Sequence, residues 1–125
     1  MKKTIILIFV FGLCCLNTFS QVYKFKSTET DVESPNGSTR TKYEVCYHTF
    51  DLKKNTVIFE GTNSKRERTK IVYSIKSTYQ DGLTFVLVIK EKGMKEIWFT
   101  PRFNSLGYDL MDGTRLACYN ITSIK

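Results

Sequence analysis

Histidine is nearly absent from this sequence, and side chains that commonly do chemistry are sparse. The chain has one histidine, His48, and no Cys-x-x-Cys pair, so it lacks the clustered ligands of zinc and similar metal sites. It also lacks the nucleophile elbow Gly-x-Ser-x-Gly, a phosphate-binding glycine loop and the metalloprotease pattern His-Glu-x-x-His. These absences predict a protein that is not an enzyme and that holds no metal or cofactor.

Long hydrophobic runs are also missing, except at the N-terminus. A lysine pair precedes an apolar run from Ile5 to Leu16, and polar residues follow it. This run is shorter than the roughly 20 residues that cross a bilayer, so it predicts a secretory signal peptide, residues 1–20. Cys14 and Cys15 fit a lipoprotein signal poorly, because leucine rather than a small residue precedes Cys14. We expect export to the periplasm or beyond the cell, with lipidation as the less favoured alternative.

Cleavage of this signal would leave residues 21–125, which we expect to form a single all-β domain. Two lysines lie in the signal, so the formal charge falls from +7 for the whole chain to +5. No other segment is apolar enough to span a membrane. A moderately basic exported protein suits acidic partners such as anionic envelope polymers, although solubility alone explains the same charge.

Cysteine is limited to two residues after the signal, Cys46 and Cys118. In an oxidising compartment such a pair favours a disulfide. Cys46 lies two residues from His48, and on a strand both side chains point to one face. A metal site or a Cys–His nucleophile is disfavoured, because no further ligand or orienting group is marked out. His48 is therefore expected to be a partly exposed strand residue.

Strand patterns fill the remaining sequence, and no helical pattern is convincing. Short runs rich in Val, Ile, Thr, Tyr and Phe alternate with polar turns, and Asp81-Gly82 and Asp112-Gly113 are typical of tight hairpins. The pattern predicts an antiparallel meander of seven to eight short strands in a small closed or partly open barrel, with a β-sandwich as the alternative. The expected strands are 22–27, 42–50, 56–61, 70–79, 83–90, 95–100, 106–111 and 114–121.

The polar segment 28–40 is the longest break between the expected strands. It contains Pro35 and the turn dipeptide Asn36-Gly37, and it indicates a loop over one end of the sheet or a loosely attached first strand. A regular eight-stranded closure separates the two cysteine strands by about 10 Å, which is too far for a disulfide. We therefore favour closure of 42–50 directly against 114–121, over a sandwich or free thiols.

In outline such a calyx resembles the lipocalin-like barrels. The segment "QVYKFKS" lacks the glycine and tryptophan that mark the start of a lipocalin, so no residue role is transferred. The resemblance implies a carrier that holds a small apolar ligand inside the barrel.

Two groups of residues are candidates for binding. A basic run, expected on a hairpin tip, is suited to phosphate or sulfate groups, but it contains no aromatic residue, which disfavours nucleic acid. An aromatic group is expected to line a pocket, with core packing as the competing interpretation. The candidate anion-binding residues are Lys65, Arg66, Arg68 and Lys70, and the candidate pocket residues are Trp98, Phe99, Phe103 and Tyr108.

The leading functional hypothesis is an exported, non-enzymatic binding module of the bacterial envelope or secretome, which recognises a protein or an anionic polymer through its loops. The alternative is the lipocalin-like carrier of a small apolar ligand. A hydrolase that works with paired carboxylates ranks third, since seven acidic residues have the right chemistry but sit in turn-like positions. These residues are Asp51, Glu60, Asp81, Glu91, Glu96, Asp109 and Asp112.

Overall fold

The computed structural model describes residues 22–62 and 65–124, and the predicted signal peptide, residues 1–20, lies outside them. The described residues form nine β-strands and one short 3-10 helix, η1. The strands are β1 (Val22–Glu33), β2 (Thr39–Asp51), β3 (Thr56–Thr62), β4 (Arg68–Asp81), β5 (Thr84–Ile89), β6 (Met94–Thr100), β7 (Ser105–Leu110), β8 (Arg115–Tyr119) and β9 (Thr122–Ile124), and η1 is Pro101–Phe103.

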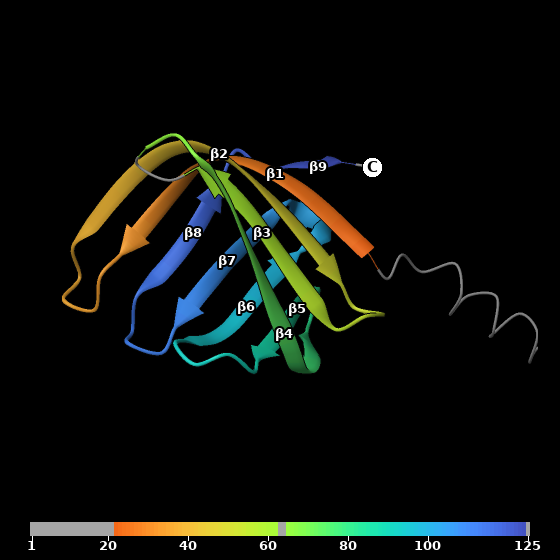
Figure 1. The fold of residues 1–125 in the computed structure, drawn as a ribbon. Helices are drawn as coiled ribbons and strands as arrows, with labels where there is room; N and C mark the ends of the chain where they lie inside the picture. The colour runs from red at the N-terminus through yellow and green to blue at the C-terminus, as the bar shows by residue number, and fades with distance from the viewer. Residues whose placement is uncertain (1–21, 63–64, 125) are drawn as a thin grey trace, which may run out of the picture.

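The first eight strands form a closed antiparallel barrel. Each strand from β1 to β8 pairs with the next, and β1 also pairs with β8, which closes the sheet (Figure 1). The short β9 adds to the other half of β1, beside residues Lys24–Lys26. This confirms the predicted all-β meander and small closed barrel, and closure leaves no sheet edge along most of the wall.

The segment 28–40 is a strand hairpin rather than the loop that the sequence suggested. β1 continues to Glu33, and β2 begins at Thr39, so the turn occupies only five residues. Within it, the Ser34 amide donates to the Ser38 carbonyl at 2.8 Å, and Gly37 adopts a φ of 91°. Three residues, 35–37, lie between the hydrogen-bonded Ser34 and Ser38. A three-residue loop with glycine in the left-handed region is a common hairpin connection, so the polar composition of the segment did not prevent strand formation.

The first strand lies at the centre of the closure, and the expectation that 22–27 is peripheral was wrong. β1 pairs with β2 along its whole length and with β8 over Glu29–Glu33. A register shift between Ser27 and Glu29 bends β1, which lets its two halves pair with β9 and β8 in turn. The strands that hold the two cysteines are therefore separated by β1.

The barrel has two ends with different interiors. We call the end with the β1–β2, β5–β6 and β7–β8 turns the hairpin end. At the opposite end, the rings of Phe50 and Phe99 stack with centroids 4.3 Å apart, and Phe85 stacks on Phe99 at 5.1 Å. Phe25 and Tyr23 complete the cluster by tilted contacts with Phe99. Each such buried side chain stabilises the fold by roughly 1.5–3 kcal/mol, so this cluster is the principal core.

Candidate functional site

A buried polar network lies between the phenylalanine cluster and the hairpin end. β2 points Cys46, His48 and Phe50 into the barrel, and His48 is completely buried. The Nε2 atom of His48 lies 2.8 Å from Ser27 Oγ, and its Nδ1 atom lies 2.6 Å from the Tyr108 hydroxyl. His48 is thus not the partly exposed residue that the sequence indicated. The network is not visible in the sequence, because the partners of His48 are 21 and 60 residues away in the chain.

Burial controls the ionisation of this network. It lowers the pKa of His48 to about 4 and raises the pKa of Tyr108 well above its usual value, so both side chains are neutral at pH 7. A neutral imidazole donates from one nitrogen and accepts at the other, which satisfies both neighbours. Among the described residues, every buried side-chain nitrogen and oxygen has a hydrogen-bond partner.

The contact between Ser27 and His48 has the distance of a nucleophile and its base, but its surroundings differ from those of a catalytic triad. The group on His48 Nδ1 is a neutral phenol rather than a carboxylate, so an imidazolium would gain little stabilisation. Ser27 has no exposed surface, which leaves a substrate no access to its hydroxyl. The arrangement orients side chains inside the barrel and lacks the features of an acyl-transfer site.

Cys46 and Cys118 are buried free thiols, and the predicted disulfide is not formed. β1 lies between their strands, with Cys46 opposite Ser27 and Cys118 opposite Thr30, which keeps the two backbones apart. Burial, with a smaller contribution from Glu44, raises the pKa of Cys46 to about 12. Burial also raises the pKa of Cys118 to about 11, so neither thiol is a reactive thiolate at neutral pH.

A small cavity of about 210 Å³ opens above this network at the hairpin end. Its walls come from the inner faces of β1, β2 and β8, and Tyr108 contributes to them beside Cys118. The surface is mostly apolar, with two charged side chains from β2 among the lining residues. The lining residues are Thr30, Val32, Lys42, Glu44, Phe59, Tyr108, Leu116 and Cys118.

The four aromatic residues predicted to share a pocket lie in different places. Phe99 belongs to the phenylalanine cluster, Tyr108 to the polar network, and Phe103 is 66% exposed on η1. Trp98 lies on the outside of the barrel over Gly107, where an added Cβ would stand 2.3 Å from its indole ring. Strand alternation separates Trp98 from Phe99, and glycine on the neighbouring strand makes room for the indole.

The predicted anion-binding run lies at the β3–β4 connection and is partly neutralised. Arg68 forms an ion pair with Glu60 on the neighbouring strand at 3.5 Å. Arg66 is exposed in the turn with a φ of 62°, and Lys65 and Lys70 are also exposed. Anion binding by these residues stays a prediction.

A second basic site, which we call the lysine groove, was missed by sequence analysis. It is an open groove of about 480 Å³ at the β5–β6 turn, next to Met111 of the β7–β8 turn. The Met111 amide donates to the Gly93 carbonyl at 2.9 Å, which joins the two turns. In the sequence this site is visible as three lysines within "KEKGMK", residues 90–95, and β4 adds the fourth lysine, Lys76. The groove is lined by Lys76, Lys90, Lys92 and Lys95, by Glu91 and Gly93, and by the apolar side chains Val88, Ile89, Met94 and Met111.

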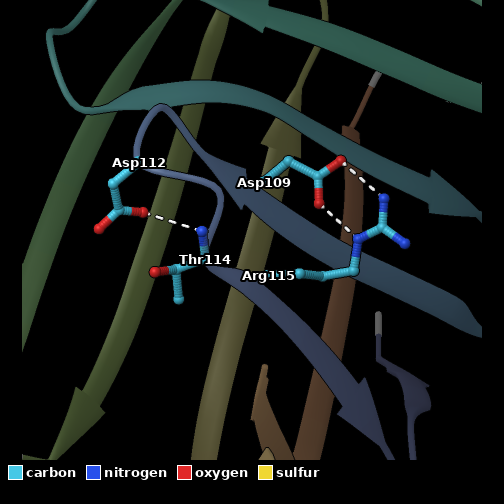
Figure 2. Close-up of polar contacts among 4 residues, drawn as sticks. All are labelled: Asp109, Asp112, Thr114 and Arg115. Carbon is cyan, nitrogen blue, oxygen red and sulfur yellow. Dashed lines mark hydrogen bonds and ion pairs between the residues drawn. The ribbon is translucent and has the colours of Figure 1, made fainter. Parts of the chain in front are cut away.

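Acidic side chains near the lysine groove are held by other partners. Figure 2 shows the paired β7–β8 residues Asp109 and Arg115, whose carboxylate and guanidinium groups are 2.7 Å apart at closest, and Asp112 accepting from the Thr114 amide at 2.8 Å. Glu91 accepts a hydrogen bond from the Ser74 amide. In the described part of the chain, none of the four groove lysines forms an ion pair.

Two more of the carboxylates proposed for a hydrolase are engaged locally. Asp51 accepts from the Lys54 amide at 3.0 Å, and Glu60 pairs with Arg68. Across residues 22–62 and 65–124, no three His, Cys, Asp or Glu side chains are grouped to hold a metal ion. The same residues include no helix long and apolar enough to cross a membrane.

Among the hollows of the described surface, the lysine groove and the small apolar cavity are the two that we consider for a ligand. Both lie at the hairpin end, and they differ in charge and in enclosure. The sequence matches no family model, and no curated protein shows significant similarity to it.

Proposed function

We propose that this protein is an exported, non-enzymatic binding module that recognises an anionic polymer through the loops at its hairpin end. The observation that carries the proposal is the lysine groove, where four lysines line a hollow whose acidic lining residue, Glu91, accepts a backbone hydrogen bond. Export is supported by the signal-like N-terminal pattern.

The chemistry of the groove fits repeated phosphate, sulfate or carboxylate groups. Lysine ammonium groups act as point charges on flexible stems, so they follow a polymer chain without demanding one geometry. The four lysines outnumber Glu91, the acidic residue that lines the groove, so the groove keeps a net positive charge, and Asp109 is paired with Arg115. The apolar lining adds contact area for the backbone of a polymer or for aliphatic groups attached to it.

Binding to heparin, used as a model sulfated polymer, tests this proposal. We expect affinity to fall steeply with salt, because bound polymer releases condensed counterions. The double substitution Lys90→Gln and Lys92→Gln should weaken binding about tenfold or more and reduce the logarithmic salt slope by about one unit per lysine removed.

The matched control removes the same charge at the opposite end of the barrel. Lys53 and Lys54 are exposed in the β2–β3 turn, away from the groove. The substitutions Lys53→Gln and Lys54→Gln together should leave affinity within about twofold, since screening is strong beyond about 10 Å. Equal losses in both double variants would contradict a groove-specific site.

The cavity of about 210 Å³ favours a second candidate function, the carriage of a small apolar ligand. The space is smaller than typical pockets for drug-sized ligands, so its occupant would be of about the size of a bicyclic ring. This function predicts binding that is largely independent of salt, which separates it from polymer binding in the same titrations.

A further inference from the structure

The strand β2 extends well beyond its neighbour β3. β3 pairs only with Tyr47–Asp51, whereas β1 pairs with β2 from Thr39 onwards. Figure 1 shows the resulting β1–β2 hairpin projecting past the end of β3. Among the described strands, none pairs with residues 39–46 on that side. An unpaired strand edge is a template for another strand, and natural proteins usually shorten or cover such edges.

The backbone of this edge points its hydrogen-bonding groups outward at alternate residues. The hydrogen bond between Ser34 and Ser38 sets the alternation of the β1–β2 ladder. Counting from it, Thr39, Thr41 and Tyr43 turn their amide and carbonyl groups away from β1 and toward the free edge. These groups are positioned to accept an added antiparallel strand.

The side chains of the edge are unusual for a solvent-facing strand. Tyr43 is 78% exposed, and Val45 is 43% exposed on the same face. Lys42 and Glu44 alternate with them and lie on the cavity side. The segment "KYEV" thus places opposite charges on either side of an exposed tyrosine.

This pattern is self-complementary about one residue. If a second copy pairs antiparallel with Tyr43 opposite the partner's Tyr43, then Lys42 faces the partner's Glu44. The symmetric contact brings Glu44 opposite the partner's Lys42, so two opposite-charge pairs flank the tyrosines. The ladder then covers residues 40–46 of each copy, which is the stretch that β3 leaves open.

Neighbouring registers are less favourable for the same reason. Centring the pair on Lys42 brings two lysines together, and centring it on Glu44 brings two glutamates together, which is destabilising. In a two-fold antiparallel pair, the residue at the axis faces the same residue of the second copy. Registers in which two different residues would face each other at the axis are therefore excluded. Charge therefore selects Tyr43 as the centre.

We propose that the protein forms a two-fold dimer in which residues 40–46 of β2 pair antiparallel with the same residues of a second copy. The interface joins the two barrels through a continuous sheet across the β2 edges and covers Tyr43 and Val45. This assembly is independent of the lysine groove, whose residues lie on β4, β5, β6 and the adjoining turns.

Charge exchange on the mature chain tests this interface by sedimentation equilibrium. The unmodified chain should be dimeric at about 100 µM, with dissociation on dilution. Lys42→Glu and Glu44→Lys each create two like-charge pairs per dimer, and each should raise the dissociation constant about tenfold or more. The double exchange restores both opposite-charge pairs, so its dissociation constant should return to within about threefold of the original.

Each outcome bears on the proposal. A monomer at about 100 µM would overturn it, as would single variants that dimerise as well as the original chain. Failure of the double exchange to restore association, with an unchanged circular dichroism spectrum, would place the interface elsewhere. Amide exchange supplies a second readout, because the Tyr43 amide should be protected in the dimer and exchange faster in Lys42→Glu.

Discussion

The two halves of the barrel interior are built from different chemistry. Away from the hairpin end, stacked and tilted aromatic rings fill the space around Phe99. Toward the hairpin end, β1 and β2 contribute Ser27 and His48, and β7 contributes Tyr108, which hydrogen-bonds to His48 beside two thiols and a cavity. A step of two residues, from Phe25 to Ser27 on β1 and from Phe50 to His48 on β2, changes the interior from ring packing to a polar network.

This difference separates a half that stabilises the fold from a half that borders a cavity. Apolar rings gain free energy from burial and dispersion without needing a fixed partner atom. A buried polar network contributes little net free energy but leaves each member costly to alter, because an unsatisfied group retains its desolvation cost. The polar half borders the cavity of about 210 Å³ at the hairpin end.

Removing a ring from the aromatic half should have the largest effect on stability. Phe99 is fully buried and contacts four other rings, so Phe99→Ala should lower the free energy of unfolding by about 3–5 kcal/mol. Urea denaturation of both chains measures this loss. The matched variant Phe103→Ala, at an exposed site, should change it by less than about 0.5 kcal/mol. Comparable losses in both variants would contradict the assignment of the core.

Acid should weaken the polar half specifically. Burial lowers the pKa of His48 in the folded protein to about 4, below its ordinary value of 6.5. The unfolded chain therefore binds a proton first as the pH falls, and the contribution is complete above pH 6.5 and lost progressively toward pH 4. Between pH 7 and pH 5 the free energy of unfolding should fall by about 2 kcal/mol.

The control for this titration is His48→Gln, which keeps a neutral hydrogen-bonding side chain. Because His48 is the only histidine, this variant should be less stable but nearly independent of pH between 7 and 5. Urea denaturation at the two pH values gives both quantities. An unmodified chain that was equally stable at pH 7 and pH 5 would be incompatible with a buried, neutral imidazole.

The smallest expected effect concerns the two thiols of the polar half, which should be protected from alkylation in the folded protein. Because burial raises their pKa values to about 12 and about 11, Cys46 and Cys118 should resist iodoacetamide at pH 8 in the folded protein. Both should react in denaturant without reductant, as peptide mapping by mass spectrometry would show. A requirement for reductant would reveal a disulfide and contradict the free thiols of the structure.

Much of the fold was predictable because strand signals are local. Alternating apolar residues and Asp-Gly turns identified the eight barrel strands, and short links between them required antiparallel neighbours. The errors occurred where local composition was ambiguous. The polar residues 28–33 extend β1 because β2 and β8 hold them on both sides, a long-range pairing that composition does not record.

The candidate sites were less predictable, because they depend on which strands become neighbours. The face shared by Cys46 and His48 followed from strand periodicity, but the partners of His48 depended on barrel closure. The lysines at the β5–β6 turn were visible as a local cluster, whereas the approach of Met111 and the separate engagement of nearby acids required the folded chain.

By itself, the sequence determined the all-β class and the antiparallel order of the strands, since these follow from the two-residue period and from short turns. The tertiary structure alone decided that β1 closes the barrel, that the thiols stay apart, that His48 is buried and neutral, and that the edge of β2 is left open. The physical reason is that register and closure are set by the packing of side chains that are distant in sequence, and these contacts create the environments that shift pKa values and shape cavities.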